Sequence, residues 1–163
     1  MALGTRYRSA VGAGTFAAFI LVLVFGSPWF AHWVGQNTSA DSALGFWLRV
    51  LTWPHWSFNT SESLRTILVD DLQAILLVVL TAVFLFLLPG SQLARARGTA
   101  SQFFAGWAAS IFASGVAAVL ASLFLRDPSL LSAMRAGAGG AAYGLYVGWI
   151  IGLATLGARR GTR

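Results

Sequence analysis

Residues 136–158 read AGAGGAAYGLYVGWIIGLATLGA, an apolar run without a charged side chain. Four of its glycines are spaced four residues apart, at Gly140, Gly144, Gly148 and Gly152. In water, each interior glycine costs a helix roughly 0.5–1 kcal/mol relative to alanine. In a bilayer, small residues at this spacing let a second helix backbone approach closely. These four glycines, called the glycine ladder below, therefore predict a membrane-spanning helix with one tightly packed face.

The composition of the whole chain also indicates a membrane protein. Of its 163 residues, 57% are apolar and 10% are charged. In a typical soluble domain, about 45–50% of the residues are apolar and about 25% are charged. There is no cysteine, which excludes disulfides, thiolate metal sites and thiol catalysis. Lysine is absent as well, and with the abundant alanine and glycine this is typical of GC-rich bacterial coding. The net charge is +6, but the arginines form no basic run, so we expect no nucleic-acid binding.

Four apolar segments are long enough to cross a hydrocarbon core, which needs about 20 apolar residues. Each must be a helix, because only helices and closed barrels satisfy their backbone polar groups in lipid. We therefore expect one all-α polytopic domain over residues 1–163, with Pro28 kinking the end of its first span. The predicted spans are residues 11–33, 68–88, 102–125 and 136–158, with an outer loop at residues 35–66.

The charges predict how this domain is oriented in the membrane. All five acidic residues and four of the arginines fall in the first and third loops or at their edges. The positive-inside rule then predicts that both termini lie in the cytoplasm. With the bacterial coding bias noted above, we expect the membrane to be a bacterial plasma membrane. The other seven arginines lie at the N-terminus, in the second loop and at the C-terminus: Arg6, Arg8, Arg95, Arg97, Arg159, Arg160 and Arg163.

The outer loop contains a segment that reads as a short interfacial helix. Residues 42–53 place Leu44, Trp47, Leu48 and Leu51 at helical spacing, with Arg49 as the single charge, a pattern typical of a helix lying in the membrane interface. Five of the seven tryptophans fall at this outer face. They predict an aromatic belt at the headgroups, or alternatively an aromatic-lined pocket for a lipid or quinone-like ligand. Residues 59–62, read as Asn-Thr-Ser-Glu, predict an N-cap for the second span.

One group of polar residues could carry chemistry. Asp70 and Asp71 lie at the outer edge of the second span, where charged groups are costly and often functional. His32 and His55 fall on the same side of the membrane. Three interpretations remain open: solvation of the aspartates in the headgroups or pairing with an arginine, proton- or cation-linked transport, and a metal or acid–base site. No dense ligand motif supports a metal, so we expect neither a metal nor another cofactor.

The third span offers a partner for the glycine ladder. Gly106, Ser110 and Ser114 belong to a stripe of small residues at intervals of four, and a stripe of alanines runs beside it from Ala105 to Ala121. Because a short loop joins the last two spans, we expect the ladder to pack on this small face. The alternative is that one stripe mediates association with a second copy.

These observations favour a non-enzymatic accessory or interaction subunit. Its expected partners are the lipid bilayer and a membrane protein or a second copy of itself. The first alternative is a small oligomeric transporter or channel that uses Asp70 or Asp71. The second is a membrane enzyme or ligand site at the outer face that uses His32 and His55.

Overall fold

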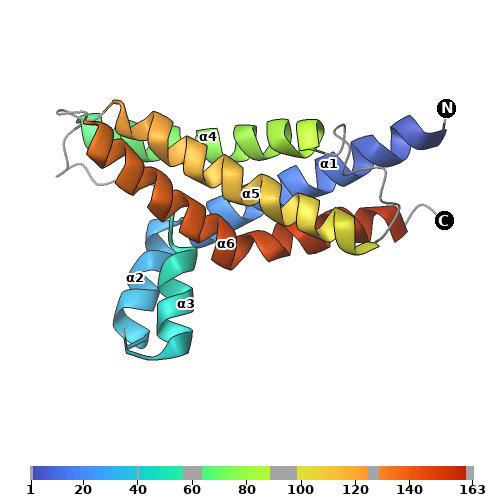
Figure 1. The fold of residues 1–163 in the computed structure, drawn as a ribbon. Helices are drawn as coiled ribbons and strands as arrows, with labels where there is room; N and C mark the ends of the chain where they lie inside the picture. Colours follow the sequence, from blue (N-terminus) through green and yellow to red (C-terminus); the bar gives the residue numbers. More distant parts are fainter. Residues whose placement is uncertain (1, 40, 57–63, 89–98, 125–128, 161–163) are drawn as a thin grey trace.

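The computed structural model describes residues 2–39, 41–56, 64–88, 99–124 and 129–160, and every regular element in these ranges is helical. Long helices lie alongside one another in a bundle, and a pair of short helices leaves it sideways (Figure 1). The elements are α1 (Ala2–Ile20), a π-helical turn η1 (Leu21–Phe25), α2 (Pro28–Asn37), α3 (Ala43–Leu51), α4 (Leu64–Leu87), α5 (Thr99–Ser122) and α6 (Leu130–Arg160).

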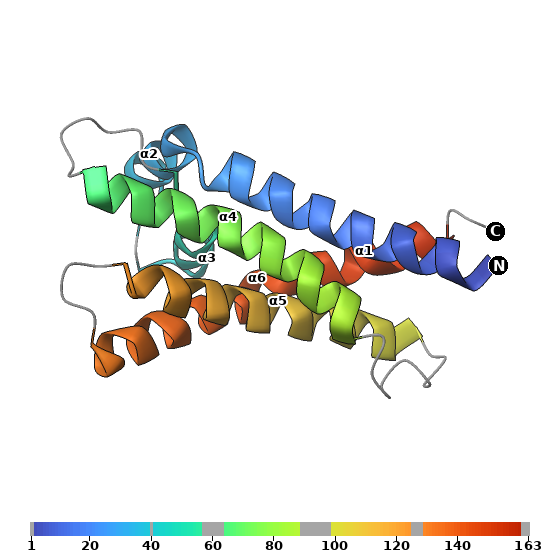
Figure 2. The same ribbon diagram turned by 90° about the horizontal axis from the view of Figure 1, so that it is seen from above.

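The long helices form a closed ring in which α1 contacts α4 and α6, and α5 contacts the same two helices from the other side. The first turn of α1 and the last turn of α6 lie at one end of the bundle (Figure 2). The other end, where α4 begins at Leu64 and α6 begins at Leu130, is called the arm end below. The α2–α3 pair, called the arm, leaves the bundle toward this end (Figure 1).

Within the described residues, three helices are long and apolar enough to cross a membrane, namely α4, α5 and α6. They cover the predicted spans at residues 68–88, 102–125 and 136–158 to within a few residues, and α6 begins six residues earlier than its predicted span. The chain is thus a helical protein with several candidate spans. The predicted helix at residues 42–53 is present as α3, and the Ser42 hydroxyl accepts from the Gly45 amide at its N-terminus.

The first predicted span, residues 11–33, differs from one straight helix. Residues 10–25 and α2 are long and apolar enough to cross a membrane only if the two are counted as one span. Their axes are bent by 61° at the break between them. Pro28 has no N–H to continue the helix from α1 and instead occupies the first position of α2. Ser27 caps this new helix, with its hydroxyl accepting from the Phe30 amide at 3.3 Å. The residues beyond the break therefore belong to the arm.

The contact between α5 and α6 is the most extensive in the bundle, and the glycine ladder lies in it. A methyl group placed on Gly144 would meet the Ile111 Cα atom and, at 2.7 Å, the Ser110 carbonyl oxygen. The same addition at Gly140 would meet the Ser114 carbonyl, and at Gly152 the Phe103 carbonyl. The two backbones are therefore in direct contact, as small residues at this spacing permit.

Polar groups cross this interface as well. The Trp107 indole N–H of α5 donates to the Leu145 carbonyl oxygen of α6 at 2.9 Å. The Ser110 hydroxyl lies 2.7 Å from the Trp107 carbonyl oxygen and 3.4 Å from that of Gly144. Ser114 donates to the Ser110 carbonyl of its own helix. Apart from Ala105, which is half-buried, both stripes of α5 are buried within one chain, including Ala109, Ala113, Ala117, Ser110 and Ser114.

A single substitution on α4 tests whether an unpaired buried hydroxyl destabilises this bundle. Thr81 is fully buried, and its hydroxyl has no hydrogen-bond partner among the residues that the structure describes. An unpaired buried polar group costs about 1–3 kcal/mol, so Thr81→Val is expected to leave the free energy of unfolding unchanged or raise it by roughly 1 kcal/mol. Unfolding in mixed micelles measures this, with Ser114→Ala as the control that breaks a bond. If Thr81→Val lowers the free energy of unfolding as much as Ser114→Ala does, the Thr81 hydroxyl is not unpaired.

Candidate functional site

The segment after α3 folds back onto the break between η1 and α2. The Trp56 indole N–H donates to the Val22 carbonyl oxygen at 3.2 Å, and the Trp56 amide donates to the Gly26 carbonyl oxygen at 2.9 Å. A methyl group on Gly26 would meet the Pro54 carbonyl oxygen, so this close approach requires glycine. The segment therefore holds the bend at which the arm leaves the bundle.

The same segment contacts two long helices. The Trp53 ring lies 4.8 Å from the ring of Tyr143 on α6, measured between centroids. His55 reaches α4, where its Nε2 atom lies 3.4 Å from Oδ2 of Asp70. The His55 side chain is 52% exposed and that of Asp70 is 21% exposed. These two predicted site residues are thus brought together at the arm end.

A small cavity of about 20 Å³ lies beside this pair, lined by Trp53, Pro54, His55, Asp70 and Gln73. Gln73 lies about one turn along α4 from Asp70, on the same side of the helix. The volume is enough for about one water molecule, and the imidazole, carboxylate and amide supply the two to four polar partners that a buried water needs.

The other two predicted site residues lie apart from this cavity. Asp71 is half-buried on α4 and projects about 100° away from Asp70 around the helix axis. His32 is exposed on α2 in the arm, and none of the contacts described for the chain joins it to His55 or Asp70. Within the described ranges, no three His, Asp or Glu side chains lie close enough to hold a metal ion. Of the predicted site residues, the structure therefore joins His55 to Asp70.

An arginine ties two helices together at the arm end. Arg65 in the first turn of α4 donates from Nε to the Phe124 carbonyl oxygen at 2.7 Å, just beyond the last residue of α5. A cation at a helix C-terminus satisfies an unpaired carbonyl and interacts favourably with the helix dipole. Arg65 thus has a role in joining α4 to α5. The predicted N-cap at residues 59–62 lies outside the described residues.

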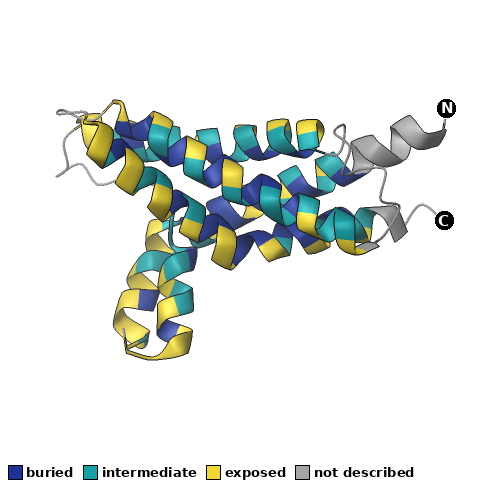
Figure 3. Cartoon of the chain, viewed as in Figure 1, coloured by how far each residue is buried: buried dark blue, intermediate teal, exposed yellow. Residues whose placement is uncertain are grey.

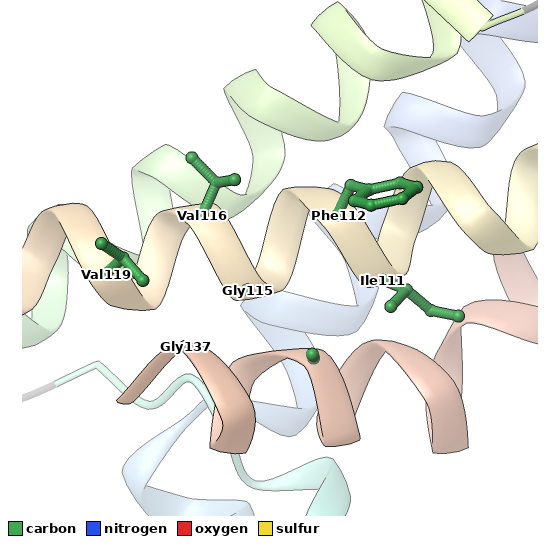
Figure 4. A pocket seen from close by; sticks show the side chains of 7 residues that line it. Ile111, Phe112, Gly115, Val116, Val119 and Gly137 are labelled. Carbon is green, nitrogen blue, oxygen red and sulfur yellow. The ribbon is translucent and has the colours of Figure 1, made fainter. Parts of the chain in front are cut away.

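A second hollow lies between α5 and α6 (Figure 4). It has a volume of about 290 Å³ and an almost wholly apolar lining. Gly115 of α5 and Gly137 of α6 both line it, and a methyl group on Gly115 would make only ordinary contacts, at 3.4 Å with the Gly137 carbonyl oxygen and at 3.5 Å with the Ala141 Cβ atom. The lining residues are Ile111, Phe112, Gly115, Val116, Val119, Gly137 and Ala141, and they define what is called the α5–α6 groove below.

Sequence reasoning missed this groove and the role of Trp56. Gly115 and Gly137 fall outside the intervals of four that mark the stripes and the ladder, and this offset was the available signal. Trp56 and Val22 are 34 residues apart, and no spacing rule links them. No protein-family model matches the chain, and neither the curated proteins nor the solved structures include one with significant similarity.

Proposed function

We propose that the chain is a small multi-pass protein of a bacterial plasma membrane and acts as a non-enzymatic accessory or interaction subunit. In this proposal α1, α4, α5 and α6 are four spans, with both termini in the cytoplasm and the arm at the outer face. The arginine distribution supports the orientation. The position of the first turn of α1 and the last turn of α6 at one end of the bundle supports the even number of spans.

The observation that carries the interaction role is the α5–α6 groove. In a membrane it opens toward lipid, because its rim residues Phe112 and Val116 are exposed large apolar side chains. The backbones at Gly115 and Gly137 are accessible between them, and small residues of this kind are what lets a partner helix pack closely in lipid. The partner we propose is therefore a transmembrane helix that inserts bulky apolar side chains between α5 and α6.

Filling the groove tests this role. A photoreactive p-benzoylphenylalanine at Val116 is expected to give one discrete adduct with a second protein in native membranes. Gly115→Leu extends its side chain into the groove and should reduce this adduct about tenfold, equivalent to about 1.4 kcal/mol of binding free energy. Gly139→Leu is the matched control, because a methyl group on Gly139 meets nothing within 4 Å.

The control variant must retain the adduct, and both variants must be recovered from the membrane at wild-type levels. Equal adduct in the two leucine variants would contradict a groove-dependent partner. Crosslinking to lipid alone would contradict it as well.

The contact between His55 and Asp70 favours ion-linked transport as a second candidate function. The carboxylate lies at the end of a candidate span, and its neighbouring cavity has room for one water. Charged groups at such a position often belong to proton or ion pathways. In this proposal Asp70 exchanges a proton or a cation with the outer solution, with His55 as its partner.

Proteoliposome flux distinguishes the two candidates. If transport is the function, Asp70→Asn is expected to abolish proton- or cation-driven uptake, because an amide does not titrate, while Asp71→Asn retains most of it. Dye-reported pH change inside the vesicles is the measurement. Flux that survives Asp70→Asn, or that is absent from the wild-type protein across a range of cations, would remove this candidate.

A further inference from the structure

The arm runs across the direction of the bundle. The break at residues 26–27 turns the chain by 61° from the axis of the preceding helix, and Figure 1 shows both arm helices pointing sideways from the long helices. If the long helices cross a membrane, the axes of α2 and α3 lie closer to the membrane plane than to its normal. This step rests on the proposed membrane placement.

The length of the helix before the break sets the depth of the arm. The apolar part that precedes it, Ala10–Phe25, is about 24 Å long at 1.5 Å per residue, whereas the hydrocarbon core is about 30 Å thick. Figure 1 shows that the beginnings of α4 and α6 extend past the arm. The arm therefore leaves the bundle before the chain has cleared the hydrocarbon.

The side chains of the arm suit that depth. Trp29 is 75% exposed and Leu44 is 66% exposed, and Trp33 and Phe46 are exposed as well (Figure 3). Indole and aliphatic side chains of this kind are favourable at the boundary between headgroups and acyl chains. In water they would form an apolar patch at the surface.

Several backbone carbonyls at the end of α2 and just beyond it accept hydrogen bonds from nearby side chains. Arg49 donates to the Thr38 carbonyl oxygen at 3.2 Å, and Asn37 donates to the Trp33 carbonyl oxygen at 2.9 Å. The Ser42 hydroxyl lies 3.1 Å from the Ser39 carbonyl oxygen, and the Thr38 hydroxyl donates to that of Val34. Non-helical backbone near lipid needs such partners. Asp41 at this tip is exposed and requires the polar headgroup level.

We propose that the arm is a lipid-binding surface, immersed at the boundary between the headgroups and acyl chains of the outer leaflet. Its occupant is outer-leaflet phospholipid: acyl chains contact Trp29, Trp33 and Leu44, and headgroups surround Asp41 and Arg49. The arm thus widens the protein in one leaflet only, and it adds to the lipid-facing surface of the spans.

The absence of cysteine makes spin labelling a direct test. Single labels at Trp29→Cys and Leu44→Cys, in nanodiscs of phosphatidylcholine and phosphatidylglycerol, should collide with oxygen more than with a water-soluble nickel chelate. Ile75→Cys, at an exposed position on α4, is the control for lipid exposure, and the free spin label in buffer is the reference for water. The two arm labels are expected to resemble the label at residue 75.

Two results would overturn the proposal. Nickel accessibility close to that of the free spin label in buffer would place the arm in water. Protection from both reagents would show that a second copy or another protein covers the arm. Failure of the membrane placement itself is distinguishable, because the label at residue 75 would then also be accessible to nickel.

Discussion

Alanine at Gly144 is expected to destabilise the bundle by about 1–3 kcal/mol, the usual cost of overpacking a well-packed core. The added methyl group would meet the Ile111 Cα atom and the Ser110 carbonyl oxygen. These are backbone atoms of α5 and cannot rotate away, so the two helices must separate and lose contact along their length. Retention of folded monomer during heating in mild detergent, followed by size-exclusion chromatography, measures the loss.

Two controls separate packing from helix propensity. Gly139→Ala and Gly157→Ala lie on the same helix, where an added methyl group meets nothing within 4 Å. In solution, the better helix propensity of alanine should raise the free energy of unfolding of both variants by up to about 1 kcal/mol. In lipid, we expect no change. If Gly144→Ala is as stable as these controls, the close contact between α5 and α6 is wrong.

The loss of stability expected for Gly148→Ala can be partly reversed by a second substitution on α5. There the added methyl group would overlap the Ser110 hydroxyl, which belongs to a side chain and can be removed. We therefore expect Ser110→Gly to restore part of the stability lost at Gly148→Ala, and to restore none at Gly140→Ala, where the obstacle is the Ser114 carbonyl. Neighbouring sites couple in this way by about 0.5–3 kcal/mol.

Gly26→Ala is expected to release the arm from its fixed direction. The added methyl group would meet the Pro54 and Val22 carbonyl oxygens, which pushes the segment carrying Trp56 away from the bend. Both Trp56 hydrogen bonds would then be lost, and two bonds amount to about 1–3 kcal/mol. Pulsed electron spin resonance between labels at Leu44→Cys and Ile75→Cys should change from one narrow distance distribution to a broad one.

Gly35→Ala on α2 is the matched control for this experiment, since a methyl group there meets nothing within 4 Å. It should keep the narrow distribution. A distribution that stays narrow and unshifted in Gly26→Ala would show that the Trp56 segment does not hold the arm.

Local sequence rules predicted much of the helical structure. Apolar length located α4, α5 and α6, and the spacing of Leu44, Leu48 and Leu51 located α3. Pro28 marked the break because its ring excludes a continuing helix. These features depend on residues within a few turns of one another, which is the range over which periodicity and capping act.

The arrangement of the arm and the candidate site was beyond these rules. The size of the bend depends on Trp56, which lies far along the chain from Val22. The sequence alone could not show which of the adjacent residues Asp70 and Asp71 contacts a histidine. The contact depends on the path by which residues 52–56 return to α4. Nor could intervals of four reveal the α5–α6 groove, since Gly115 and Gly137, which line it, fall outside those intervals.

The membrane topology is the claim on which the rest of the account depends, and the cysteine-free chain allows it to be measured directly. Single cysteines at Leu3, Ser39, Ser91, Ser129 and Gly161 would be treated with a membrane-impermeant maleimide in cells with an intact plasma membrane. The account predicts labelling of Ser39→Cys and Ser129→Cys from outside, and of the other three only after the membrane is opened. External labelling of Leu3→Cys together with Ser39→Cys would show that α1 does not cross, and would contradict the four-span account.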